Sequence, residues 1–226
     1  MGQKDIAEKT FEAYNDVFTD IVNGFLFQGE PLIQEKTLTD AQPFSVYKAD
    51  GKLHQMERDI AKYWNHRQPD RKRTSCKSRR RIYFRVACLG IENQTNYDRD
   101  MPLRVIGYDG AAYRAELLDD RKERYPVITL VLYFGEKRWG QNRSLYDVLE
   151  VPEKLRPYVY DYGINVFEVS YLTEEQINWF HSDFRIFQFT HCKKRVDSSN
   201  HQYHHKEIDQ SLIAQSVFGK IHNTKY

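Results

Sequence analysis

The sequence predicts a mixed α/β fold in which helices pack on one layer of sheet. Residues 126–135 form the most continuous apolar run of the chain, and their β-branched content is typical of a central strand buried on both faces. Residues 82–94 begin as a second strand of β-branched and aromatic side chains. Apolar residues recur at three- and four-residue steps in 11–27 and again in 102–118, which predicts two helices.

The N-terminal part of the chain is expected to contain a helix, an irregular segment and a β-hairpin. The first helix is predicted at Phe11–Phe27, followed by an irregular, proline-containing segment at 30–43. Asp50-Gly51 favours a tight turn between two strands. The strands would be Phe44–Tyr47 and a long returning strand at Leu53–Trp64.

Strand alternation, apolar periodicity and a capping box define the remaining elements. They are a helix that begins at Pro102 and ends near Leu118, the strand 126–135, a short helix at Leu145–Leu149, a strand at Ile164–Tyr171 and a helix from Thr173 to Phe189. After Lys193 the chain becomes polar and histidine-rich. We therefore expect one domain over residues 1–190 and a polar tail over 191–226.

Composition narrows the class of protein. The chain has 226 residues, of which 40% are hydrophobic and 14% aromatic, so it can bury one good core and is not disordered. No apolar run approaches the roughly 18 residues of a membrane span, and the N-terminus has no apolar signal core. The three cysteines are scattered, which favours reduced thiols. These features predict a cytoplasmic protein with no membrane partner.

The net charge of +2 says little about partners, but the basic residues are unevenly distributed. Segment 67–81 contains eight basic residues and one acid, so it is expected to be an exposed loop between two strands. Such a cluster suits contacts with the phosphate backbone of DNA, although a solvated loop without a ligand is the alternative. The residues expected to bind phosphate are Arg71, Lys72, Arg73, Arg79, Arg80 and Arg81.

An acid and an amide stand at the end of the strand 82–94. Glu92 and Gln94 project from the same side of a strand, and Asp59 would lie near Glu92 if the two strands joined by the basic loop pair with each other. Two carboxylates there could bind Mg²⁺, and the amide could orient an attacking water. The alternative is that these side chains are separate surface groups. The histidines of the tail have no recognised zinc-binding spacing.

Three segments resemble the recombination-promoting nuclease and putative transposase family of the PD-(D/E)XK nuclease superfamily. They are NDVFTDIVN, GIENQTNYDRDMPLRVIGYD and PVITLVLYFG, of which the second is the most specific. The resemblance covers roughly Lys4 to Phe189, and the tail does not match the helical continuation of such proteins, which predicts an altered or truncated end. It implies a restriction-endonuclease-like fold, a mixed sheet core flanked by helices.

The resemblance also implies an activity and a set of residues. Members of the family are similar to endonucleases that cleave DNA with Mg²⁺ or Mn²⁺ and are associated with mobile elements and recombination. By position, Asp59 matches the strand aspartate and Glu92 the second acid, and both would be metal ligands. Asp16 matches the acid of the first helix, with Asp20 as a competitor. Gln94 stands where the wider superfamily usually has lysine.

The glutamine leaves the activity open. An amide supplies dipoles and hydrogen bonds but no charge, so slower chemistry, or none, is expected. The expected function is a metal-dependent DNA endonuclease, and the alternative is an inactive nucleic-acid-binding remnant of a mobile-element nuclease. A purely protein-binding domain is a third alternative. The sequence leaves both a monomer and a homodimer open.

Overall fold

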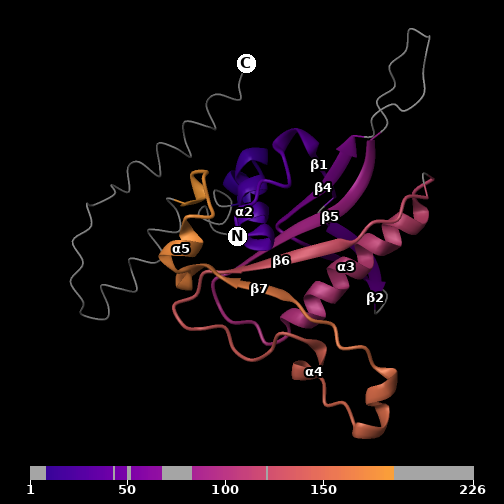
Figure 1. Cartoon of the computed structure of the whole chain (residues 1–226). Coiled ribbons are helices and arrows are strands. Elements are labelled where there is room, and N and C mark those ends of the chain that lie inside the picture. The colour runs from indigo at the N-terminus through magenta and orange to yellow at the C-terminus, as the bar shows by residue number, and fades with distance from the viewer. Residues whose placement is uncertain (1–8, 43, 50–51, 68–82, 121, 186–226) are drawn as a thin grey trace, which may run out of the picture. The chain divides into compact units, whose positions relative to one another are not determined.

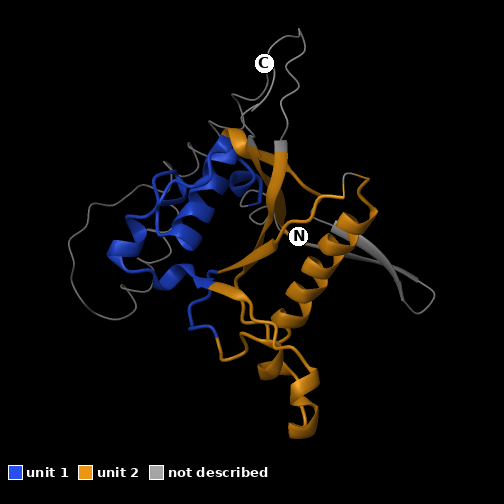
Figure 2. Cartoon of the chain, turned by 45° about the vertical axis from the view of Figure 1, so that its right-hand side comes forward, with its two compact units in different colours: residues 1–35, 133–139, 167–226 blue, residues 36–132, 140–166 orange. Residues whose placement is uncertain are grey.

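A computed structural model describes residues 9–42, 44–49, 52–67, 83–120 and 122–185 of the chain (Figure 1). The chain divides into two compact units (Figure 2). Unit 1 comprises Met1–Glu35, Tyr133–Trp139 and Phe167–Tyr226, and unit 2 comprises Lys36–Leu132 and Gly140–Val166.

Unit 2 contains the five-stranded sheet, apart from the last residues of two strands. The strand order is β1 (Leu38–Asp40), β4 (Ile60–Arg67), β5 (Tyr83–Gln94), β6 (Val127–Tyr133) and β7 (Asn165–Glu168). Neighbouring β1 and β4 are antiparallel, as are β4 and β5. Helix α3 (Met101–Leu118) runs alongside this sheet (Figure 1). The predicted α/β fold, a mixed sheet core flanked by helices, is confirmed.

The predicted central strand is confirmed in β6, which lies between β5 and β7. All of its side chains except Ile128 are buried, including Leu130 and Leu132. Because consecutive side chains point to opposite faces of a strand, a run of buried residues means that both faces are covered. The continuous apolar sequence arises for this reason.

The predicted hairpin is present, but its second strand is shorter than expected. Strands β2 (Phe44–Ala49) and β3 (Lys52–Glu57) are antiparallel and form their own two-stranded sheet. The prediction of one strand at Leu53–Trp64 is wrong, because the chain bends at Arg58 and Asp59 and then enters β4 in the larger sheet. Polar partners inside unit 2 bind the buried Arg58 side chain and hold this bend.

Segment 30–43 and the predicted short helix at Leu145–Leu149 can be compared with the structure. Segment 30–43 is less irregular than predicted, because it contains the 3₁₀ turn η1 (Glu35–Thr37) and the short strand β1. The three residues of β1 pair with three residues of β4. The short helix α4 (Leu145–Val148) is confirmed and begins with a capping box formed by Ser144 and Asp147. A second 3₁₀ segment, η2, spans Glu153–Tyr158.

Unit 1 has an aromatic core built around Phe25 of α2 (Asn15–Phe27). The ring of Phe25 packs against Phe180 at 4.9 Å and against Phe184 at 6.3 Å between centroids. The first helix was predicted to be continuous from Phe11, but the chain is helical at 9–12, turns, and becomes helical again at Asn15.

The last predicted helix is also interrupted. The capping box at Thr173 is confirmed, but α5 (Glu174–Ile177) is short and follows the 3₁₀ turn η3 (Val169–Tyr171). The Asp20 carboxylate accepts hydrogen bonds from the backbone N–H groups of His181 and Ser182. These N–H groups cannot then donate along a continuous helix, so the predicted helix to Phe189 is wrong.

Within the described ranges, no helix is long and apolar enough to cross a membrane. Residues 186–226 lie outside the described residues, and so do the predicted phosphate-binding residues of segment 67–81 beyond Arg67. The expected division of the chain at residue 190 therefore stays a prediction.

Candidate active site at the end of the paired strands

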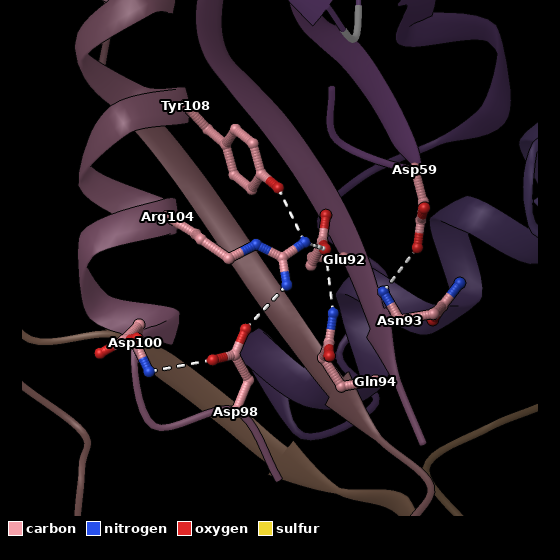
Figure 3. A network of polar contacts seen from close by, with 8 residues as sticks. All are labelled: Asp59, Glu92, Asn93, Gln94, Asp98, Asp100, Arg104 and Tyr108. Atoms are coloured by element: carbon pink, nitrogen blue, oxygen red, sulfur yellow. Dashed lines mark hydrogen bonds and ion pairs between the residues drawn. The ribbon is translucent and has the colours of Figure 1, made fainter. Parts of the chain in front are cut away.

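The residues singled out in the sequence come from the same end of two neighbouring strands (Figure 3). Strands β4 and β5 pair with Ile60 opposite Ile91, so Asp59 and Glu92 are the next residue on each chain at that end. Further along the same pair, Tyr63 lies opposite Cys88, and Ala112 of α3 packs against the cluster that contains Cys88. By alternation, Gly90, Glu92 and Gln94 of β5 project from the same face of the sheet as Cys88.

Glu92 is the buried acid of this site. Only 3% of the residue is exposed. Its Oε1 accepts a hydrogen bond of 3.0 Å from Nε2 of Gln94 and one of 2.5 Å from Nη2 of Arg104. The expected placement of Glu92 and Gln94 on one side of the strand is therefore observed, and a cation from α3 joins them.

Arg104 connects this site to the start of α3. Its Nη1 donates to Oδ2 of Asp98 at 2.9 Å, and its Nη2 also donates to the Tyr108 hydroxyl at 3.0 Å. Burial disfavours the charge on Arg104, but the contacts with Asp98 and Glu92 outweigh burial and raise the pKa of the guanidinium. The arginine therefore stays charged beside a buried carboxylate.

Asp59 lies in the bend before β4 (Figure 3). Its Oδ2 accepts a hydrogen bond of 2.7 Å from the backbone N–H of Asn93. Burial raises the pKa of the Tyr108 hydroxyl, and the negative charges of Glu92 and Asp59 raise it further. Burial and the two acids together keep this hydroxyl protonated.

The carboxylate oxygens of Asp59 and Glu92 can be compared with the ligands that a divalent cation requires. The described residues include no group of three or more His, Cys, Asp or Glu that could hold a metal ion. Mg²⁺ is nevertheless commonly bound by one or two carboxylates, with the remaining positions filled by water and substrate phosphate. Asp59 and Glu92 carry hard oxygen donors of this kind, in a number that matches what Mg²⁺ commonly takes from a protein.

Asp16 and its competitor Asp20 both lie on α2 in unit 1. Asp20 is engaged within that unit, because its Oδ2 accepts hydrogen bonds from both the backbone N–H and the hydroxyl of Ser182. Asp20 therefore serves the local fold, which leaves Asp16 as the acid of α2 that the resemblance assigns to the site. That role stays a prediction.

A second polar network lies on the same face of the sheet. The Nη1 of Arg58 donates to Thr129 Oγ1 at 3.0 Å and pairs with Asp109 Oδ1 at 3.4 Å. Asp109 also accepts hydrogen bonds from Thr129, at 2.6 Å, and from the Tyr162 hydroxyl, at 2.5 Å. A Cβ atom at Gly90 would lie 2.7 Å from Arg58 Nη1, so the glycine provides the space for this arginine.

Sequence reasoning missed Arg104 as a member of the site. One signal was present: Arg104 and Tyr108 are four residues apart and therefore share a face of α3, and an aromatic residue of the predicted helix 102–118 is a candidate for its buried face. A charged residue one turn before that tyrosine has to meet either solvent or a carboxylate. Arg58 and Asp109 gave no such signal, because 51 positions separate them in the sequence.

One comparison with known proteins gave a match. A family model described as "Putative transposase, YhgA-like" matches residues 83–218, which is more than half of the chain. The matched segment begins with β5 and contains Glu92, Gln94 and Arg104, and Asp59 precedes it. No curated protein matches the chain. No solved structure matches it either.

Proposed function

The chain belongs to the YhgA-like family of putative transposases, and from that premise we propose that it is a metal-dependent DNA endonuclease. The observation that carries the proposal is the nearly complete burial of Glu92 at the end of a strand, beside Gln94 and a second acid in the adjoining bend. A buried carboxylate is costly unless it is paired or binds a metal. Arg104 pairs with Glu92 in this structure, and a bound metal ion would be a second way to compensate the buried charge.

Asp59 and Glu92 would hold Mg²⁺ or Mn²⁺. When bound, the ion would supply an activated water and neutralise charge on the phosphodiester. Gln94 donates its amide Nε2 to Glu92. Its amide oxygen can accept a hydrogen bond from a water and so orient that water toward the phosphate. The role that the resemblance implies for Asp16 stays a prediction.

DNA is the proposed substrate and partner. The family name indicates transposition, which acts on DNA. The basic segment 67–81 precedes β5, the strand that carries Glu92 near its end. Its cationic side chains are suited to contacts with backbone phosphates that carry no base information.

The proposal is tested by incubating supercoiled plasmid with the purified protein and Mg²⁺ or Mn²⁺, and by measuring nicked and linear products. The wild type is expected to cleave, and chelation of the metal is expected to stop cleavage. Glu92→Gln and Asp59→Asn keep the side-chain shape but remove a charged ligand, so each should lose at least about 100-fold in rate. Glu150→Gln, at an exposed acid in unit 2, is the matched control. Unchanged cleavage by both site variants would reject the assignment.

A non-catalytic DNA-binding protein is the second candidate. It is favoured by one specific observation: the buried acid of the site is ion-paired to Arg104. The amide of Gln94, where the wider superfamily usually has lysine, agrees with this candidate. This candidate predicts salt-dependent DNA binding without product in either metal. Cleavage that disappears in Glu92→Gln would exclude it.

A further inference from the structure

Phosphodiester hydrolysis places additional negative charge on the phosphate in the transition state, and a positioned cation lowers the free energy of that state. Gln94 cannot provide the charge. Two described arginines of unit 2 make contacts with α3 residues or from α3 near the Glu92 end of β5. They are Arg58, whose side chain is 3% exposed, and Arg104, whose side chain is 40% exposed.

Burial and hydrogen bonding separate the two arginines. Arg58 is enclosed and its Nη1 is held by Asp109 and Thr129. Arg104 makes its contacts from a partly solvated position: they use three of the five N–H donors of a guanidinium, one toward Asp98, one toward Glu92 and one toward Tyr108. Two donors remain for another anion.

We propose that Arg104 is the phosphate-binding cation of this site, and that its ion pair with Glu92 is the arrangement adopted without DNA. The proposal rests on the endonuclease function proposed above and names the residue that replaces the missing lysine. A guanidinium can bind two phosphate oxygens side by side, which an amide cannot do.

The ion pair also has a consequence for metal binding. Arg104 donates to Oε1 of Glu92, which is an oxygen that a cation would use. Arginine and metal therefore compete for this carboxylate in the DNA-free protein. When a phosphate draws the guanidinium away from Glu92, the carboxylate becomes available, so DNA and metal should strengthen each other's binding.

Arg104→Gln tests both parts of the proposal, with Arg114→Gln as the control. Arg114 is an exposed arginine of the same helix, so its replacement removes the same charge from α3 away from Glu92. DNA affinity is measured without metal as a function of salt, and Mn²⁺ affinity is measured by calorimetry without DNA. In Arg104→Gln the slope of log affinity against log salt should fall by about 0.9, the value for one lost phosphate contact.

The same variant should bind Mn²⁺ more tightly, roughly 3- to 10-fold, because the competing cation is gone. It should also cleave at least about 100-fold more slowly. A purely structural role of Arg104 predicts the opposite for the metal, since a loosened site binds Mn²⁺ more weakly. Arg104→Lys keeps the charge and should retain the salt slope with an intermediate cleavage rate, and it serves as the second variant if Arg104→Gln does not fold.

The outcomes separate the two proposals. If the wild type never cleaves, the endonuclease function is wrong. The assignment of Arg104 as a phosphate-binding cation is then tested by the salt slope and the Mn²⁺ affinity alone. If the wild type cleaves but Arg104→Gln cleaves equally well with an unchanged salt slope, the function stands and the Arg104 assignment is wrong. Weaker Mn²⁺ binding by Arg104→Gln would overturn the competition between arginine and metal.

Discussion

Two ion pairs that differ in solvent exposure connect α3 to the sheet side of unit 2. One joins α3 to Arg58 in the bend before β4, and the other joins it to Glu92 of β5. In the pair Arg58–Asp109 both side chains are almost fully enclosed, at 3% and 4% exposure, and Thr129 and Tyr162 supply further hydrogen bonds. In the pair Arg104–Glu92 the acid is just as enclosed, at 4%, but the arginine is 40% exposed. One pair is closed and the other is open on its cationic side.

This difference in the exposure of the arginine determines which pair can exchange partners. Removing one member of a closed pair leaves a buried charge without compensation, so such a pair holds the fold. In the open pair the arginine stays solvated when it turns toward water or toward an anion, and Glu92 then needs another partner, such as a metal ion. The first pair thus fixes the bend that presents Asp59, and the second is available for the site.

The largest effect is expected from breaking the closed pair. Asp109→Ala leaves Arg58 buried without its carboxylate and should lower the free energy of unfolding by about 3–5 kcal/mol. Urea denaturation monitored by circular dichroism measures the change. Asp120→Ala, at an exposed acid just beyond α3, should change stability by less than about 0.5 kcal/mol. A loss below about 1 kcal/mol in Asp109→Ala would contradict the structural role of the pair.

A smaller loss is expected from crowding the same arginine. Gly90→Ala would place a Cβ 2.7 Å from Arg58 Nη1, and this overpacking should cost about 1–3 kcal/mol. Gly110→Ala is the matched control on α3, where an added Cβ meets nothing within 4 Å. Because alanine is the better helix former, that variant should gain about 0.5–1 kcal/mol. Equal effects at the two glycines would argue against a tightly held Arg58.

The open pair should contribute less than the closed pair to the free energy of unfolding, and its contribution should depend on the salt concentration. A double-mutant cycle of Arg104→Ala and Glu92→Ala should give a coupling below about 1 kcal/mol after allowance for the exposed guanidinium. Added salt should reduce this coupling, because solvent-exposed charges are screened. The corresponding cycle for Arg58 and Asp109 should be larger and nearly independent of salt. Similar couplings in the two cycles would remove the distinction between the pairs.

The smallest effect concerns pH. Burial raises the pKa of Asp109 above the ordinary 3.8, although Thr129, Tyr162 and Arg58 each lower it. The folded state then binds a proton more tightly than the unfolded state does. Asp109 therefore contributes a gain in stability as pH falls through its raised pKa toward 3.8, and a loss as pH rises. In Asp109→Asn this component of the pH slope should be absent in denaturation curves, and an unchanged slope would contradict the raised pKa.

Local patterns in the sequence were sufficient for much of the fold. Alternation and β-branched content located β5 and β6, and an Asp-Gly pair located the hairpin between β2 and β3. The capping box at Thr173 was also present as predicted. These features depend on residues that are near one another in the chain, so one sequence contains the information. The lengths of elements were less predictable, as the early end of α5 shows.

Helix α3 and the bend before β4 mark the limit of that reasoning. The sequence by itself determined that an acid and an amide end β5 on one side, because strand alternation requires it. Only the tertiary structure decided that Arg58 turns inward to Asp109, which ends β3 and moves Asp59 out of a strand. It also brought Arg104 to Glu92, across 12 positions of the sequence. Such partners are chosen by packing and by the need to pair buried charge, and a linear pattern does not encode that choice.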